Sequence, residues 1–157
     1  MTPERLSRED VAILRLESGE VAGHTLKLLV LEPPADGPRP GLPEIRATVA
    51  ARLAAAPELR RRLAPTPLRL AAPVWVDDQD FDIERHVRPV PQAGPVGEQR
   101  LREIVADSMR ERLDRAHPLW SLEVVEGLED GGLALIWKLH HAMADGTASM
   151  RIGRDVL

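Results

Sequence analysis

The stretch LALIWKLHHAMADG, residues 133–146, decides the fold, because it joins a strand pattern to a turn that carries polar chemistry. Alternate residues from Leu133 to Leu139 are large and apolar, so they are expected to share one face of a strand. His140 and His141 stand next to each other at the strand end, where neighbouring side chains point to opposite faces. One imidazole is therefore expected to face the packed interior and the other an open cleft.

The turn after this strand carries the rest of the pattern H-H-x-x-x-D-G. Asp145 lies four residues beyond His141. A carboxylate there can hold the loop, either by accepting backbone N–H groups or by pairing with a buried cation. Gly146 permits a sharp backbone turn.

A histidine held in this way suits the activation of a hydroxyl group. An alcohol is a poor nucleophile at neutral pH, whereas imidazole, with an ordinary pKa of about 6.5, is then a largely neutral base. A positioned base typically contributes about 10²–10⁴-fold in rate. An acyl thioester is already activated, so no Ser or Cys nucleophile is needed. The separate His24, His86 and His117 are expected to be structural or solvent-facing.

The rest of the chain alternates helix and strand patterns. Ser7 to Glu17 is predicted to be a helix, with Ser7 as N-cap and Asp10 placed for a capping box. Further helices are predicted over 42–56 and 98–113, and a short one from after Gly146 to Leu157; strands are predicted over 25–31, 74–76, 119–125 and 133–139. The alternation predicts one α/β domain, in the form of an α+β two-layer sandwich.

Some segments have more specific expectations. Residues 25–31 form a dense apolar run that predicts a buried strand. Residues 83–90 are expected to be extended or irregular, and the Gly/Asp-rich segment 127–132 suits a hairpin turn. The inner face of the helix over 98–113 is expected to include Met109.

Composition limits the classes of function. The chain has 157 residues, 43% of them hydrophobic and 29% charged, which is typical of a globular domain. The net charge of −4 gives no reason to expect a nucleic-acid partner. There is no cysteine, which excludes disulfides, thiolate metal sites and a Cys nucleophile. No secretory signal or membrane-spanning run is expected.

Two other motifs are set aside. Asp78, Asp80 and Asp82 alternate like a calcium loop, but Ile83 and Pro89 stand where that loop needs Gly and Glu, so a solvated acidic loop is expected. The run of arginines at 60–62 could contact phosphates or an anionic membrane, yet a solvated helix face is the simpler interpretation. The paired histidines suggest no metal site, because adjacent strand residues diverge.

The pattern H-H-x-x-x-D-G at a strand end resembles the signature of the CoA-dependent acyltransferase superfamily, which includes chloramphenicol acetyltransferase and peptide-synthetase condensation domains. The surrounding sequence is similar to the bacterial wax ester synthase/diacylglycerol acyltransferase family, over nearly the whole chain and in order. The similar segments are Leu6-Ser7 with Asp10, Leu29 to Pro33, Pro73-Val74-Trp75 with Asp77-Asp78, Phe81-Asp82 with His86-Val87, Pro118-Leu119-Trp120 and Glu126-Gly127-Leu128.

The resemblance implies a role for each residue of the pattern. His141 would be the catalytic base and His140 its support, while Asp145 and Gly146 would shape the loop. The implied reaction is transfer of a fatty acyl group from acyl-CoA, as co-substrate, to diacylglycerol or a long-chain alcohol, with no bound cofactor or metal. Lipid substrates imply a cytoplasmic protein in peripheral contact with the inner membrane face or a lipid droplet.

The same resemblance implies that the chain is one half of a two-domain fold like that of chloramphenicol acetyltransferase. Family members are considerably longer, with two similar domains facing each other across a tunnel. Residues 1–157 would be the N-terminal acyltransferase domain, and the C-terminal domain would be supplied in cis or by a second chain. Without that domain, oxyanion stabilisation of about 2.7–4 kcal/mol per donor would be lost.

Two other functions stay open. The chain could be a catalytically silent, truncated binding module, which predicts a large apolar face. It could also be a condensation-type acyltransferase, in which an amine attacks a carrier-bound thioester.

Overall fold

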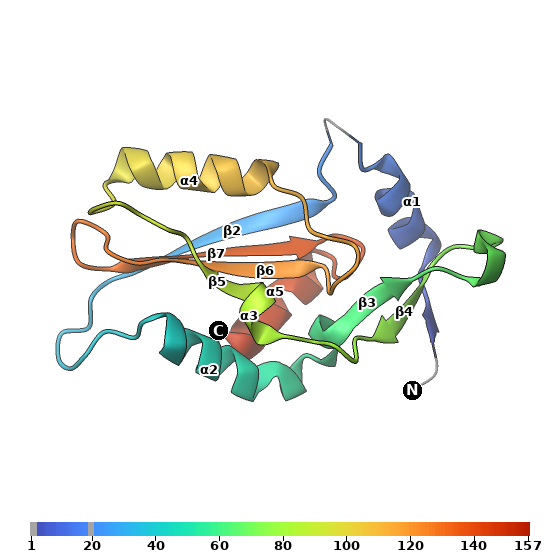
Figure 1. Ribbon diagram of the computed structural model, residues 1–157, viewed down its shortest axis with the longest axis horizontal. Helices are drawn as coiled ribbons and strands as arrows, with labels where there is room; N and C mark the ends of the chain where they lie inside the picture. The colour runs from blue at the N-terminus through green and yellow to red at the C-terminus, as the bar shows by residue number, and fades with distance from the viewer. Residues whose placement is uncertain (1–2, 19–20) are drawn as a thin grey trace.

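The computed structural model describes residues 3–18 and 21–157, which form two sheets with helices around them (Figure 1). The smaller sheet has the strand order β1-β4-β3, and the larger has the order β2-β7-β6-β5. The smaller sheet consists of β1 (Glu4–Arg5), β3 (Arg61–Ala64) and β4 (Val74–Asp77), and the larger of β2 (His24–Leu31), β5 (Val87–Pro89), β6 (Trp120–Val125) and β7 (Leu133–His140). In the larger sheet β5 and β6 run parallel, and the other neighbouring strands run antiparallel.

Helices cover both faces of the four-stranded sheet. Helix α4 lies on one face, and α2 and α5 lie on the other (Figure 1). The helices are α1 (Arg8–Leu16), α2 (Leu42–Arg52), α3 (Ile83–His86), α4 (Glu98–Arg110) and α5 (Gly146–Val156), with 3₁₀ turns at Leu53–Ala55, Pro57–Arg60 and Pro67–Arg69. The mixed helix-and-sheet class predicted from the sequence is confirmed, and the helices on both faces add a layer to the two that were expected.

The core sits on both sides of the β6–β7 hairpin. On the side of α2 and α5, two tryptophans, Trp120 and Trp137, pack against residues such as Val49 and Ile152. On the side of α4, Ile136 packs against Ile104. Strand alternation therefore gives the hairpin an apolar contact on each face.

Local sequence signals explain where several elements begin and turn. Ser7 caps α1 and forms the predicted capping box, accepting from the Asp10 N–H at 3.0 Å while its own N–H donates to the Asp10 carboxylate at 3.1 Å. The predicted hairpin between β6 and β7 is confirmed. Gly127 and Gly131 turn it at φ values of 76° and 84°, a region that favours glycine.

The structure corrects five local predictions. Strand β2 is an edge strand and is mostly half-exposed, so residues 25–31 do not form a buried strand. Of residues 83–90, expected to be extended or irregular, Val87–Pro89 form the extended strand β5, but Ile83–His86 form the short helix α3. Met109 is 40% exposed because it lies on the outer side of α4, whereas Ser108 is buried on the inner side.

The fourth and fifth corrections concern the arginine and aspartate runs. Arg60 is exposed at the end of a 3₁₀ turn, but Arg61 and Arg62 lie in β3, so the solvated helix face was wrong for these two. Asp78 is buried and faces Arg62, with 3.5 Å between Asp78 Oδ1 and Arg62 Nε. The pairing of β3 with β4 explains why the arginines meet the aspartates. Its register places Arg61 opposite Asp77, and Arg62 opposite Val76, two residues before Asp78.

Candidate active site

The two adjacent histidines differ in exposure as the strand pattern predicts. His140 ends β7 and is buried, with 1% of its surface exposed, while His141 follows it and is exposed. The backbone of both is fixed, because His140 N–H donates to the Leu119 carbonyl at 3.0 Å and His141 N–H to the Gly23 carbonyl at 2.8 Å. An exposed imidazole on a fixed backbone is available to an incoming hydroxyl group.

The turn that follows is closed by backbone hydrogen bonds and a helix cap. Met143 N–H donates to the His140 carbonyl at 2.9 Å. Asp145 is the N-cap of α5, and its carboxylate accepts the Ala148 N–H at 2.7 Å. Of the two roles that the sequence left open for Asp145, the structure shows the acceptance of a backbone N–H. Gly146 is the first residue of α5, and a Cβ there would meet no atom within 4 Å.

The imidazole of His140 is oriented by its neighbours. Its Nδ1 accepts the Ala142 N–H at 3.0 Å, so the ring proton of the neutral form is on Nε2. The ring packs on Gly23, where an added Cβ would lie 2.4 Å from Nε2. Burial lowers the pKa of His140 to about 4, and the nearby Glu17 offsets this only in part. His140 is therefore neutral at physiological pH.

A buried carboxylate faces this ring. Glu17 follows α1, and its Oε2 lies 3.8 Å from His140 Nε2. Arg115 donates to Glu17 through Nε at 3.1 Å and through a second guanidinium nitrogen, and it also donates to the Leu14 carbonyl at 2.8 Å. Burial raises the pKa of Glu17, but the Arg115 hydrogen bonds outweigh it and hold the pKa below its usual value. Glu17 is thus ionised beside a neutral His140.

Two side chains from the sheet hold the C-terminal end of α4. Lys138 is fully buried, and its Nζ donates to the carbonyls of Ser108 at 2.9 Å and Glu111 at 3.0 Å. His24, on the neighbouring strand, donates from Nε2 to the Met109 carbonyl at 3.1 Å. A cation at a helix C-terminus is favourable, because the carbonyl dipoles point toward it. Burial lowers the pKa of Lys138, and nearby carboxylates partly offset this.

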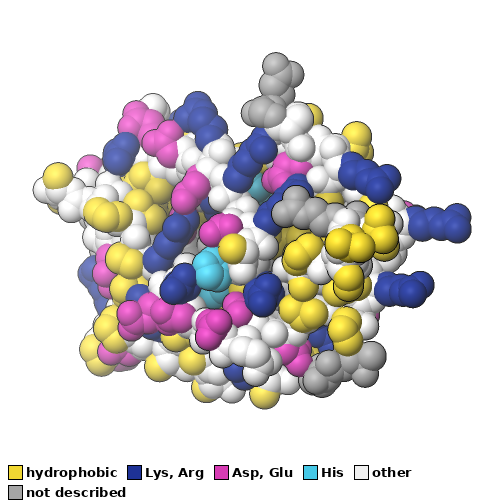
Figure 2. All heavy atoms as spheres, turned by 45° about the vertical axis from the view of Figure 1, so that its right-hand side comes forward, with side chains coloured by type: hydrophobic (Ala, Val, Ile, Leu, Met, Phe, Trp, Pro, Cys, Tyr) yellow, Lys and Arg dark blue, Asp and Glu magenta, His cyan; other side chains and the backbone are white. Residues whose placement is uncertain are grey.

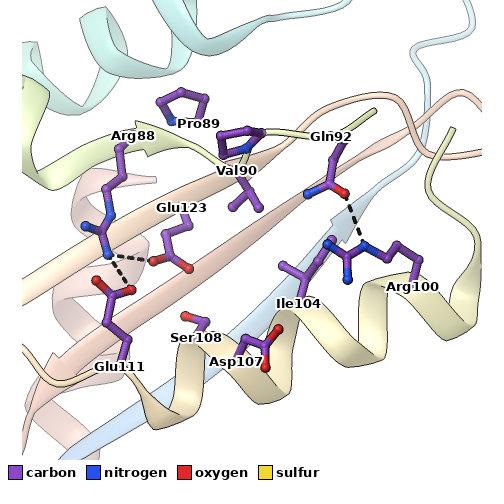
Figure 3. A pocket seen from close by; sticks show the side chains of 11 residues that line it. Arg88, Pro89, Val90, Gln92, Arg100, Ile104, Asp107, Ser108, Glu111 and Glu123 are labelled. Carbon is purple, nitrogen blue, oxygen red and sulfur yellow. Dashed lines mark hydrogen bonds and ion pairs between the residues drawn. The ribbon is translucent and has the colours of Figure 1, made fainter. Parts of the chain in front are cut away.

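A cavity of about 350 Å³ lies under α4, apart from the histidine turn (Figure 3). Arg88 donates there to both Glu111 at 2.9 Å and Glu123 at 2.8 Å, and Arg100 donates to Gln92 at 3.3 Å. The residues lining the cavity include none of the four motif residues. Its charged groups pair largely with one another, so the cavity is not part of the candidate site.

Histidine, charged and hydrophobic side chains share the end of the molecule near α1 and β4. Figure 2 shows histidine amid charged side chains, with hydrophobic side chains gathered beside them. Helix α1 and the turn between β3 and β4 contribute the exposed Leu16, Leu68 and Leu70. Over residues 3–18 and 21–157, no group of three or more His, Cys, Asp or Glu side chains is placed to hold a metal ion.

Sequence reasoning missed most of the surroundings of His140. It gave no role to Glu17, Arg115 or Gly23, which come from distant parts of the chain, and no local signal pointed to them. Lys138 did carry a signal, because a lysine inside an apolar strand must find partners when both faces are covered. His86, set aside as structural or solvent-facing, is buried and donates to the Trp120 carbonyl at 2.8 Å.

Comparisons with known proteins identify the family of the chain. The family profile described as wax ester synthase/diacylglycerol acyltransferase catalytic domain matches residues 6–157. A putative diacylglycerol O-acyltransferase of Mycobacterium tuberculosis is 41% identical over 142 residues, which cover 90% of this chain and 30% of that protein. A probable diacylglycerol O-acyltransferase of the same organism is 44% identical over 117 residues, covering 74% and 25%.

Solved structures show the same fold. The wax ester synthase/diacylglycerol acyltransferase from Marinobacter aquaeolei VT8 superposes with a TM-score of 0.76 at 30% identity, covering 96% of this chain and 37% of that one. The starter condensation domain of rhizomide synthetase superposes with a TM-score of 0.71 at 16% identity, which shows the fold alone. The chain thus spans about a quarter to two-fifths of the length of these relatives. Its profile match and its identities place the chain in the wax ester synthase/diacylglycerol acyltransferase family.

Proposed function

We propose that residues 1–157 form the N-terminal domain of an O-acyltransferase that transfers a fatty acyl group from acyl-CoA to diacylglycerol or a long-chain alcohol. The observation that carries this proposal is the exposed His141, held at the end of β7 by its N–H bond to Gly23. Family membership supplies the reaction class, and the exposed imidazole supplies a base for it.

The chemistry follows from the placement of the two histidines. His141 takes the proton of the acceptor hydroxyl as its oxygen attacks the thioester carbonyl carbon. The C–S bond then breaks, the ester forms, and the CoA thiolate takes the proton from the imidazolium. His140 remains neutral and supports the turn, Asp145 caps α5, and Gly146 begins that helix.

The second half of such an enzyme would pack against an exposed apolar groove. The groove lies between β2 and α5, holds about 380 Å³, and is lined by Leu29, Met150 and Leu157 among others. Leu28, on the edge strand, and Met150, on α5, are exposed hydrophobic residues that line it. An exposed apolar patch beside an unpaired strand edge is typical of an interaction surface. We propose that a C-terminal acyltransferase domain, in the same or a second chain, covers it.

The substrates set the expected location. One rhizomide synthetase starter condensation domain has been solved in complex with C8-CoA. We propose acyl-CoA as the co-substrate of this chain, with no bound cofactor. No helix among the described residues has the length and hydrophobicity needed to cross a bilayer. We propose a cytoplasmic protein in peripheral contact with the inner membrane face or a lipid droplet, where its lipid acceptors reside.

The test is an acyl-transfer assay on this chain combined with the C-terminal part of a relative. Hexadecanol and diacylglycerol compete as acceptors for palmitoyl-CoA, and both ester and free thiol are measured. We expect His141→Ala to lower turnover by about 10²–10⁴-fold. His117→Ala is the matched control, because His117 contacts Arg85 and lies outside the turn, and it should keep the parent rate. Equal ester formation by parent and His141→Ala would show that His141 is not the base.

Two arms of the assay address the alternatives. An amine acceptor replaces the alcohol in one arm, because condensation domains share the fold. Faster transfer to the amine would favour a condensation-type enzyme. In the other arm, binding of the supplied C-terminal part is measured directly, and binding without turnover would favour a catalytically silent module.

A further inference from the structure

The ring Nε2–H of His140 is the starting point, because it is buried and close to a charged side chain. His140 Nε2 is buried and has no hydrogen-bond partner among the described residues. Its Nδ1 is already occupied by the Ala142 N–H, so the ring cannot exchange tautomers without losing that bond. A buried N–H without an acceptor costs free energy, so a nearby acceptor that could bind it would stabilise the folded chain.

Glu17 is the carboxylate placed to be that acceptor. Its Oε2 lies 3.8 Å from Nε2, one small side-chain movement from a hydrogen bond of about 2.7–2.9 Å. Its side chain is 5% exposed, and Arg115 holds it from the loop after α4. The other charged or titratable groups acting on His140 are Arg115, His24 and His141, and none of these is an anion.

Arg115 lies in the loop that follows the buried end of α4. Lys138 binds the carbonyl of Glu111, where the loop toward Arg115 begins. Arg115 also donates to the Leu14 carbonyl, which fixes the guanidinium against α1. Strand β7, helix α4 and helix α1 therefore converge on one carboxylate, and that carboxylate faces one imidazole.

We propose that Glu17, held by Arg115, is a positioning residue that accepts the Nε2–H of His140 and thereby fixes the turn that presents His141. With the ring fixed, its Nδ1 accepts the N–H of Ala142, the residue after His141. The residue before it, His140, donates its own N–H to the Leu119 carbonyl, so the backbone is held on both sides of His141. Glu17 itself contacts no substrate. Its effect on rate rests on the proposed function, whereas its effect on the His140 ring does not.

The ring is tested directly by nitrogen NMR of the histidine side chains in the 157-residue chain. We expect His140 to be the Nε2–H tautomer, with a ring proton that exchanges slowly with solvent. Glu17→Leu should speed that exchange by at least about tenfold, and Glu17→Gln, whose amide oxygen can still accept, should restore most of the protection. Glu58→Leu is the matched control, because Glu58 pairs with Arg151 and faces no histidine.

Arg115→Gln provides a second variant that leaves the carboxylate in place but releases it. We expect faster exchange of the His140 ring proton in this variant too, so the proposal remains testable if Glu17→Leu does not fold. An Nδ1–H tautomer in the parent would overturn the proposal. So would unchanged exchange in a folded Glu17→Leu or Arg115→Gln chain.

Kinetics then separate positioning from general stability. In the combined acyl-transfer assay, Glu17→Leu should lower kcat by about 10- to 100-fold with little change in KM, and Glu17→Gln should recover most of kcat. A rise in KM alone, or no change in kcat, would overturn the effect on rate. If His141→Ala keeps full activity, the proposed function fails, while the NMR result on Glu17 still stands or falls by itself.

Discussion

The two faces of the four-stranded sheet use the same strands but differ in chemistry. Toward α2 and α5, the hairpin strands present apolar residues, including Trp120, Trp137 and Leu139. Toward α4, the neighbouring positions include Lys138 and His140, both buried. Strand β7 therefore presents only apolar residues toward α2 and α5, whereas toward α4 it presents both the apolar Ile136 and a polar network. The polar residues of that network lie near the end of β7, where the exposed His141 begins the turn.

The apolar face should dominate stability. Trp137→Ala removes a buried ring that packs at a tilt against Trp120 and leaves a large cavity, so we expect a loss of about 3–5 kcal/mol in the free energy of unfolding. Urea unfolding followed by circular dichroism measures it. Val30→Ala, on the exposed edge of the same sheet, should change stability by about 0.5 kcal/mol or less. Similar losses in both variants would remove the distinction between core and edge.

The polar face should make stability depend on pH. The pKa of His140 is about 4 in the folded chain against an ordinary 6.5, so below pH 6.5 the unfolded chain binds a proton that the folded chain does not. Stability is therefore full above pH 6.5 and falls as the pH drops toward 4, by about 3 kcal/mol for this group.

His24 and His86 also have pKa values lowered by burial and add to the same decline. Urea unfolding at several pH values should therefore compare the parent with His140→Asn, which removes one titrating group. We expect the parent to lose more stability than the variant between pH 6.5 and 4. Parallel curves would mean that His140 titrates normally in the folded chain.

Two lysines on adjacent strands sharpen the comparison of the faces. Lys138→Met removes the cation that binds two carbonyls at the end of α4, and we expect a loss of about 2–3 kcal/mol. Lys27→Met affects the opposite face, where Lys27 is half-exposed and bonds to Ser149, so about 1 kcal/mol or less is expected. Thermal or urea unfolding of both variants measures the two losses of stability. A larger loss of stability in Lys27→Met than in Lys138→Met would contradict the view that Lys138 is the more important of the two lysines.

The smallest effect is expected at the start of α5. Asp145→Ala removes the N-cap acceptor of Ala148 and should cost about 1 kcal/mol of stability. Asp145→Asn keeps an oxygen in the same position and should cost much less. If both substitutions cost the same, the negative charge of Asp145 matters more than its cap, and the alternative role as the partner of a cation gains support.

Much of the fold follows from local patterns. The capping box at Ser7, the glycine turn between β6 and β7, and the alternation up to Leu139 each encode their own structure, and all three predictions are confirmed. Strand β2 was placed correctly but its burial was wrong, because an apolar run looks the same at the edge of a sheet as at its centre.

The candidate site was only partly predictable. Adjacent strand residues must diverge, so the contrast between buried His140 and exposed His141 follows from the sequence. The catalytic role of His141 stays a prediction. Glu17 and Arg115 are separated by 98 positions in the chain and meet only through tertiary packing. Hydrophobic periodicity in a single sequence does not predict a contact between residues so far apart.

Gly23 has a consequence for recognising related chains. Any side chain at this position would occupy the space of the His140 ring, since even a Cβ would lie 2.4 Å from it. A homologue that keeps both histidines but carries a larger residue here must either swing the first ring elsewhere or separate the two strands. Position 23 can therefore serve, by inspection alone, to sort homologues that share this arrangement from those that retain the motif in a different geometry.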